Sequence, residues 1–331
     1  MQNLPLIIAE IGSVHDGSFG NALKLIEAAA RCGADVVKFQ THIAEAETLK
    51  DAPMPPYFKG EPRFEYFKRT GFSDEQWSEL RSACHRADVL FSSSPFSLEA
   101  VDLLERIGID LYKVPSGEVT NIPLLEKLSS TGKPVLLSTG MSDWEEIDAA
   151  VHVLEQGGPL CVMQCTSQYP TPPEKAGINL ISEILERYAC IPGYSDHTRG
   201  SAASFAAAAL GARVIEKHFA FSRLMYGSDA LNSMEPDEFE QFCSGLKDIW
   251  TMLDNPVDKN NLDDVREMKT IFQKSIVAAR RIEKGHVITE QDLAFKKPGD
   301  GIPAASYRMI LGKRASKTIP EDSKLTESDY T

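Results

Sequence analysis

Short apolar runs alternate with amphipathic stretches along roughly the first three quarters of the chain. Each apolar run is bounded by turn-forming or acidic residues, a pattern typical of strands that are buried on both faces. The expected strands cover residues 6–10, 35–40, 88–94, 110–116, 134–140, 160–167, 190–196 and 213–219.

The stretches between these runs have the apolar spacing of helices, and several are followed by the glycine that often ends a helix. The expected helices cover residues 21–33, 74–87, 98–108, 121–132, 143–158 and, last, 235–253. Strict alternation of strand and helix predicts a parallel sheet of the α/β class. Eight repeats favour a closed (β/α)8 TIM barrel over an open sheet.

The pattern changes after residue 254. Residues 255–272 are polar and carry no strand signal, so we expect a linker there. Residues 273–331 alternate short strand-like pieces with turns, and "ARRIEKGHVITEQDL" resembles "SKTIPEDSKLTESDY". We therefore predict a catalytic barrel at 1–254 and a small second module at 273–331, which is large enough to cover a site.

Composition excludes several classes of protein. The net charge of -13 argues against a nucleic-acid binder, because such proteins rely on an excess of lysine and arginine. The N-terminal residues lack a secretory signal pattern, and no apolar run reaches the roughly 18 to 20 residues that cross a bilayer. The six cysteines form no C-x-x-C pair and are expected to be buried and free rather than in disulfides. We expect a cytoplasmic protein that binds neither nucleic acid nor membrane.

Two lysines stand near the carboxyl ends of expected strands, where the working residues of such barrels lie. Because side chains alternate along a strand, Lys38 shares a face with Gln40, and Lys113 shares one with the apolar residue two positions before it. A buried ammonium without a counter-charge is costly. An anionic ligand could supply that charge, and so could a buried glutamate such as Glu10 or Glu118; the spacing leaves both explanations open.

Two histidines stand at the ends of neighbouring strands. His197 follows the seventh expected strand, and His218 ends the eighth on the same face as Glu216. Their imidazoles should meet at the mouth of the barrel, where they suit a divalent cation with open coordination positions. The alternative is that each is a hydrogen-bonded core histidine. Among the other histidines, His85, His152 and His286 are expected to face solvent. The roles of His15 and His42, which stand at strand ends, remain open.

Several ordered motifs resemble the sialic acid synthase family, which includes N-acetylneuraminate, legionaminate and spore-coat polysaccharide synthases. They include "IIAEIGSVHDG", "GADVVKFQT", "YKVPSGEVTNIPLL", "KPVLLSTGMS", "QCTSQYPTPP", "GYSDHTRG", "VIEKHF" and "GSDALNSMEPDEF". The resemblance covers essentially the whole chain, and the tail resembles the family's antifreeze-like (SAF) domain.

The resemblance implies that the chain condenses phosphoenolpyruvate with an N-acylated amino sugar such as N-acetylmannosamine and releases phosphate. It also implies a divalent metal, Mn²⁺ in the first place and Mg²⁺ or Co²⁺ as alternatives, with His197 and His218 at the ligand positions. The metal would polarise the sugar aldehyde as a Lewis acid.

The resemblance assigns further positions by motif. Those that match the family's phosphoenolpyruvate site are Lys38, Ser94, Lys113, Ser116, Ser138 and Ser167. Those that match sugar contacts are Gln40, Tyr169 and Asp229, and Glu10 and Glu118 match acidic positions that could move protons.

Lys297 stands where many relatives have an arginine that reaches into a partner's barrel and contacts the N-acyl group. The family is a domain-swapped homodimer in which each SAF domain caps the other subunit's barrel, and we expect the same here.

Some residues depart from the family pattern. Val14 replaces an asparagine, Ser167 stands where asparagine occurs, Ser94 replaces a threonine, and Lys297 lacks the planar fork of arginine. These changes suggest a variant amino sugar. Two alternatives remain: a related synthase that uses another aldehyde, such as a phosphorylated sugar that would need more basic residues, and a catalytically silent carbohydrate-binding barrel.

Overall fold

The computed structural model describes residues 5–53, 61–227 and 229–331. The chain divides into two compact units, Met1–Asn255 and Pro256–Thr331. Among the described residues, no helix combines the length and the apolar character needed to span a membrane.

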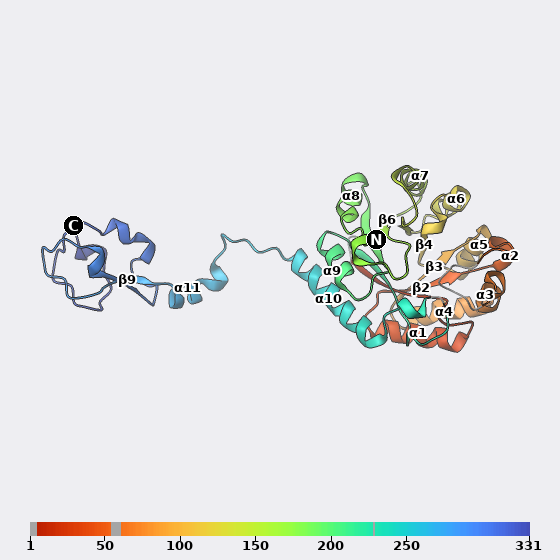
Figure 1. Cartoon of the computed structure of the whole chain (residues 1–331), viewed down its shortest axis with the longest axis horizontal. Helices are drawn as coiled ribbons and strands as arrows, with labels where there is room; N and C mark the ends of the chain where they lie inside the picture. The colour runs from red at the N-terminus through yellow and green to blue at the C-terminus, as the bar shows by residue number, and fades with distance from the viewer. Residues whose placement is uncertain (1–4, 54–60, 228) are drawn as a thin grey trace. The chain divides into compact units, whose positions relative to one another are not determined.

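Within the described residues of the first unit, eight parallel strands close into a barrel in chain order, β1 pairing with both β2 and β8 (Figure 1). The expected TIM barrel is thus confirmed. The strands are β1 (Leu6–Gly12), β2 (Val36–Thr41), β3 (Leu90–Pro95), β4 (Leu111–Val114), β5 (Val135–Ser138), β6 (Leu160–Cys165), β7 (Ile191–Asp196) and β8 (Val214–His218).

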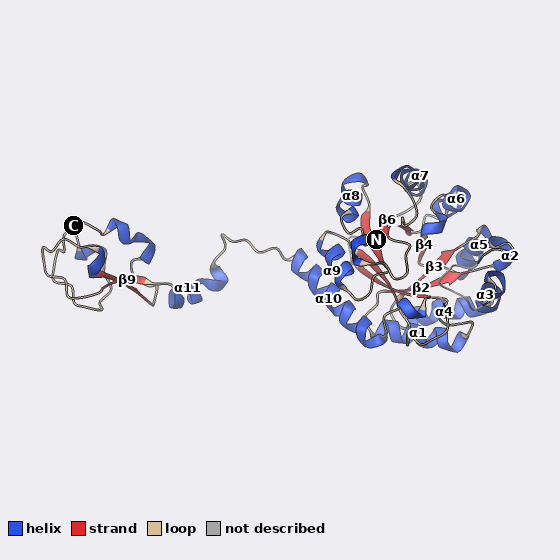
Figure 2. Cartoon of the chain, in the orientation of Figure 1, coloured by secondary structure: helices blue, strands red, loops and turns tan. Residues whose placement is uncertain are grey.

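Helices surround the barrel (Figure 2). They are α1 (Phe19–Arg31), α2 (Ala44–Glu47), α3 (Arg63–Thr70), α4 (Asp74–Arg86), α5 (Leu98–Ile107), α6 (Ile122–Ser130), α7 (Trp144–Leu154), α8 (Leu180–Arg187), α9 (Ala202–Ala209) and α10 (Pro236–Asp254). Helices α2 and α3 were not anticipated, because they interrupt the simple alternation between β2 and β3. Side-chain caps begin several of the others, as where Ser73 and Asp143 accept hydrogen bonds from the first turns of α4 and α7.

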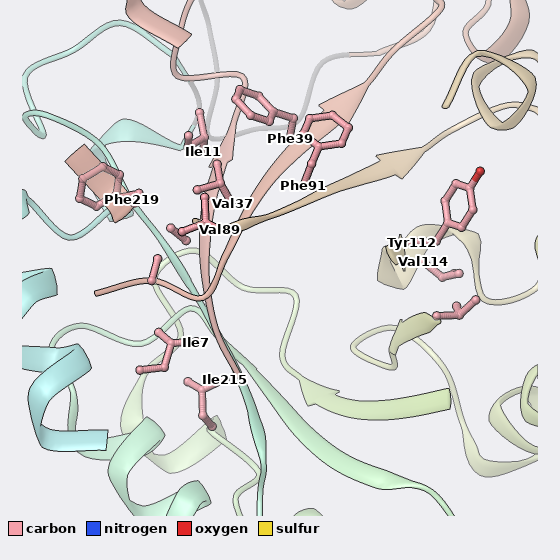
Figure 3. Close-up of a cluster of buried hydrophobic side chains, with 14 of the residues drawn as sticks. Ile7, Ile11, Val37, Phe39, Val89, Phe91, Tyr112, Val114, Ile215 and Phe219 are labelled. Atoms are coloured by element: carbon pink, nitrogen blue, oxygen red, sulfur yellow. The ribbon is translucent and has the colours of Figure 1, made fainter. Parts of the chain in front are cut away.

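Apolar side chains lie on both faces of the strands. The outward-facing residues pack against the helices, and Figure 3 shows Phe39 beside Phe91 and Ile7 beside Ile215 in this layer. The inward-facing residues form a second, smaller cluster: Ile8, Val36, Leu111, Leu136, Cys161, Met163 and Val214. Because side chains alternate along a strand, the residues two positions further on also point inward. The barrel interior is therefore apolar below and polar towards the carboxyl ends of the strands.

The second unit begins with the segment that we expected to be a linker. That segment contains helix α11 (Arg266–Phe272). Its apolar residues were not interpreted as helical because the pattern is too short to be distinguished from a polar connection.

The rest of the second unit is a small module around its own apolar core. Strands β9 (Ser275–Ala278) and β10 (Leu293–Lys296) pair antiparallel. The sequence repeat corresponds to a structural one, since Thr289 with Asp292 and Thr326 with Asp329 form equivalent capping boxes. The two repeats meet where Ile282 and Ile319 exchange backbone hydrogen bonds of 2.9 and 2.8 Å.

Candidate active site

A cavity of about 470 Å³ opens at the carboxyl ends of the barrel strands. It brings together twelve of the residues selected from the sequence: Glu10, Lys38, Gln40, Ser94, Lys113, Ser116, Ser138, Ser167, Tyr169, His197, His218 and Asp229. Two selected residues, Glu118 and Lys297, are not among those that line it.

The two lysines are paired with buried glutamates. The ammonium of Lys38 lies 2.7 Å from Glu10 Oε2 and 3.8 Å from Glu216 Oε2, and that of Lys113 lies 2.6 Å from Glu216 Oε1. Ser195 also donates a hydrogen bond to Glu216. Internal pairing is therefore present, but the partner of Lys113 is Glu216 rather than Glu118. These four ionisable side chains share one buried interior, and when all four are ionised their charges sum to zero.

Burial and charge act in opposite directions on the two carboxyl groups. Burial raises the pKa of Glu10 to about 7, and this effect outweighs the opposing effect of Lys38. Burial would also raise the pKa of Glu216, but Lys113 and Lys38 together hold it well below its usual range. Near neutral pH, Glu10 is thus the group that can take up a proton, and a protonated Glu10 leaves the cluster with a net positive charge.

The two histidines meet at the cavity, with ring centroids 5.5 Å apart. His197 Nδ1 lies 2.9 Å from the carbonyl oxygen of Thr166, which can only accept a hydrogen bond. Nδ1 therefore carries a proton, which leaves Nε2 for a ligand. His218 Nδ1 is buried with no hydrogen-bond partner, and burial lowers the pKa of His218 to about 4, so its lone pair is available.

These features fit a divalent metal held by two imidazoles, with an outer hydrogen bond on one of them. In the described part of the chain, no cluster of three or more histidine, cysteine or carboxylate side chains has metal-binding geometry. Asp229 Oδ2 is 4.0 Å from His218 Nδ1. Two protein ligands would leave positions for water and substrate.

A buried ion pair on the outer side of the barrel connects the strands that carry the histidines. The ammonium of Lys217 lies 2.9 Å from Asp196 Oδ2 and donates a 2.6 Å hydrogen bond to the carbonyl of Thr198. These residues are the sequence neighbours of His197 and His218, and they point to the other face of their strands. The pair therefore holds both histidines in register.

The serine hydroxyls converge around a glycine. Ser116 accepts a 2.9 Å hydrogen bond from the amide of Gly140. A Cβ on Gly140 would lie 2.6 Å from the Ser167 hydroxyl and 2.9 Å from that of Ser116, so no larger residue fits without displacing them. Ser138 has a buried hydroxyl without a partner. Three serine hydroxyls thus lie close together in the cavity and can donate hydrogen bonds, which suits an anionic group.

Two selected residues lie elsewhere. Glu118 belongs to the 3-10 turn Ser116–Glu118 and accepts a hydrogen bond from Asn121; burial raises its pKa. Lys297 belongs to the second unit, where its ammonium lies 4.6 Å from the centre of the Phe272 ring. Val14, which departs from the motif, is buried in the apolar cluster outside the barrel and offers no polar group.

Other cavity-lining residues were missed. Arg63, Tyr66 and Phe67 come from α3, which is not at a strand end and carries no motif signal. Glu216 could have been found, because it shares a face with His218. His42 follows β2 directly, and its position had left its role open.

Comparisons with known proteins identify similar families and relatives for both parts of the chain. The NeuB family model matches residues 25–258, and the SAF domain model matches residues 273–331. N,N'-diacetyllegionaminic acid synthase of Campylobacter jejuni is 37% identical over 97% of this chain and 99% of its own. N-acetylneuraminate-9-phosphate synthase of Mus musculus is 34% identical over 97% and 91%.

Among solved structures, the N-acetylneuraminic acid synthetase of Leptospira borgpetersenii has a TM-score of 0.71 and 30% identity. The match covers 81% of this chain and 91% of that one.

Proposed function

We propose that this chain, which belongs to the NeuB family, is a nonulosonic acid synthase. Its relatives are acid synthases. The proposed reaction joins phosphoenolpyruvate to an N-acylated amino sugar such as N-acetylmannosamine. The observation that carries the proposal is the cavity itself. Buried lysines, a group of hydroxyls and two histidines face one cavity at the end of the barrel where catalysis takes place in this fold.

In the proposed reaction, C3 of phosphoenolpyruvate forms a bond to the aldehyde carbon of the open-chain sugar. The aldehyde oxygen takes one proton of a water molecule and becomes a hydroxyl, while the remaining hydroxide adds at C2. The bond between C2 and the phosphate oxygen then breaks, phosphate leaves with that oxygen and with the proton of the added hydroxyl, and C2 becomes the ketone. The products are a nine-carbon 2-keto-3-deoxy acid and inorganic phosphate, so atoms and charge balance without a redox partner.

Phosphoenolpyruvate carries about three negative charges, which a dry cavity must balance. Lys38 and Lys113 provide ammonium groups, and Ser116, Ser138 and Ser167 provide hydroxyl donors beside Gly140. Because the lysines are already paired, the anion competes with Glu10 and Glu216 for them. Protonation of Glu10, whose pKa is about 7, releases Lys38 for the substrate.

The acceptor sugar would lie beside Gln40, Tyr169 and Asp229 on the other side of the cavity. The Tyr169 ring lies 4.1 Å from the ring of His197, centre to centre, so the sugar and the histidines are neighbours. The charges of Glu47 and Arg63 both act on the pKa of Glu118, so Glu118 lies near these residues. We propose Glu118 as a further proton carrier.

We propose Mn²⁺ as the metal, with Mg²⁺ and Co²⁺ as alternatives, held by His197 and His218. When bound, such an ion supplies Lewis acidity towards a carbonyl oxygen. The orphaned nitrogen of His218 supports this assignment.

One observation favours a second candidate, a synthase that takes a phosphorylated sugar. Arg63 lines the cavity, its Nε is buried without a hydrogen-bond partner, and it provides the extra basic residue that such a substrate needs. However, Glu118 lies near enough to both Arg63 and Glu47 for their charges to interact with its own, and the negative charges of Glu47 and Glu118 would repel a second phosphate. The unphosphorylated sugar therefore remains the first candidate.

We also propose a cytoplasmic, domain-swapped homodimer. Apolar side chains are exposed in the second unit, including Val257, Met268, Phe272 and Met309. Such side chains would be covered in a dimer. All six cysteines are free, as is usual in a reducing compartment.

The test is phosphate release from phosphoenolpyruvate with Mn²⁺ and a panel of N-acylated amino sugars, each with and without a terminal phosphate. Release with an unphosphorylated sugar is the expected result. Release only with phosphorylated sugars would establish the second candidate. No release with any sugar would leave the catalytically silent carbohydrate-binding barrel as the remaining alternative.

A further inference from the structure

His42 occupies a narrow aromatic slot at the edge of the cavity. Its ring stacks on Phe67 at a centroid distance of 3.7 Å and an interplanar angle of 6°, and on Phe96 at 4.2 Å and 16°. The guanidinium of Arg63 also lies over the Phe67 ring, 5.2 Å from its centre. The side chain of His42 is 5% exposed, so its ring is almost completely shielded from water.

Both ring nitrogens of His42 have partners. Nδ1 lies 2.7 Å from the carboxylate oxygen Oε1 of Glu47, whose side chain is 4% exposed. Nε2 lies 3.2 Å from the amide oxygen of Gln40. The amide nitrogen of Gln40 donates a 2.8 Å hydrogen bond to Glu10 Oε1. A continuous chain of contacts therefore runs from Glu47 through His42 and Gln40 to the Lys38–Glu10 pair.

The direction of this chain is fixed by what each group can donate. While Glu10 is ionised, its carboxylate can only accept hydrogen bonds, so Gln40 turns its NH₂ group to Glu10 and its oxygen to His42, which is the orientation in the structure. That oxygen requires a proton on Nε2 of His42. On the other side of the ring, Nδ1 lies within hydrogen-bond distance of Glu47 Oε1, at 2.7 Å.

We propose that His42 is a positioning residue for the acceptor sugar: its Nε2–H group holds the Gln40 amide in the orientation that presents NH₂ towards Glu10 and the cavity. Without this hydrogen bond, a side-chain amide can rotate by half a turn and present its oxygen to the Glu10 carboxylate, which repels it. Gln40 lines the cavity on the side proposed for the sugar. The inference thus rests on the proposed function, and it assigns the effect to the sugar rather than to phosphoenolpyruvate.

The principal test compares His42→Phe with His42→Gln. Phenylalanine keeps the stack between Phe67 and Phe96 but donates no hydrogen bond, whereas glutamine can place a donor nitrogen near the position of Nε2. We expect His42→Phe to raise the Michaelis constant for the sugar roughly three- to tenfold, the size of one lost hydrogen bond. The constant for phosphoenolpyruvate should change by less than about twofold, and His42→Gln should recover most of the loss.

A double-mutant cycle with Gln40→Ala shows whether His42 acts through Gln40. In the Gln40→Ala background, His42→Phe should have no further effect on the Michaelis constant for the sugar. An equal effect in both backgrounds, an equal rise for both substrates, or no effect at all would overturn the proposal. His152→Phe is the matched control, because His152 is 80% exposed on α7 and does not line the cavity.

A second measurement does not depend on turnover. Nitrogen-15 NMR of histidine-labelled protein, recorded above the pKa of Glu10 of about 7 and assigned by comparison with His42→Phe, should show Nε2 of His42 protonated. A bare Nε2 would place two acceptors face to face and would refute the proposed direction. If the unmodified enzyme releases no phosphate with any sugar, the proposed function fails, while the NMR result still decides whether His42 donates to Gln40.

Discussion

Lys113 and Glu216 form an ion pair of 2.6 Å across the interior of the barrel, from β4 to β8. In a closed barrel of this strand order these two strands stand opposite each other. Both side chains are almost fully buried. The pair therefore joins the half of the barrel that carries the serine hydroxyls to the half that carries the histidines.

Removal of Glu216 should destabilise the barrel strongly. In Glu216→Ala the ammonium of Lys113 stays buried without its partner, and we expect the free energy of unfolding to fall by roughly 3 to 5 kcal/mol. Chemical denaturation measures this. The matched control is Glu79→Ala, which breaks an exposed pair with Arg86 and should cost no more than about 1 kcal/mol. Equal costs at the two sites would show that Lys113 finds another counter-charge.

Glu10 should make stability depend on pH. Its pKa is about 7 in the folded chain and 4.5 in the absence of burial, so the folded state holds a proton that the unfolded state has lost between these values. Its contribution is complete below about pH 4.5 and is lost as the pH rises to about 7. The difference in free energy of unfolding between the native chain and Glu10→Gln should change by up to about 1.4 kcal/mol per pH unit in this window. A constant difference would mean that Lys38 keeps Glu10 ionised.

His218→Ala should weaken Mn²⁺ binding, because it removes one of two proposed ligands. We expect a loss of affinity of at least about tenfold in calorimetric titration, with the fold unchanged by circular dichroism. Turnover should also disappear. His152→Ala, at an exposed position, is the control and should bind as the native chain does. Full activity of the native chain after chelation would exclude the metal site.

Lys297 should act on the partner's barrel. Lys297→Ala alone should raise the Michaelis constant for the sugar more than that for phosphoenolpyruvate. Mixing His218→Ala with Lys297→Ala chains should restore activity, since in a swapped heterodimer one intact barrel meets one intact SAF domain. Mixtures no more active than the sum of their parts, under conditions in which subunits exchange, would count against the swap. If Lys297 only stabilises its own unit through the contact with Phe272, Lys297→Ala should not change the Michaelis constant for the sugar specifically.

The periodic pattern of apolar residues along the chain was sufficient to predict the barrel and much of the site. Strands with a period of two must place Lys38 and Gln40 on one face, and eight repeats of strand and helix close most readily into a barrel. The strand ends then brought His197 and His218 to one cavity, as their neighbouring positions required. These features follow from local geometry, which a sequence carries directly.

Contacts between distant segments were decided only by the tertiary structure. The spacing left the partner of Lys113 open because alternation says which side of a strand faces inward but not which strand stands opposite. The stack around His42 needs α3, whose place over the cavity depends on packing after β2. Local periodicity thus determined the elements and their inward faces, whereas barrel closure and helix packing determined which charges meet, because those distances depend on the whole chain at once.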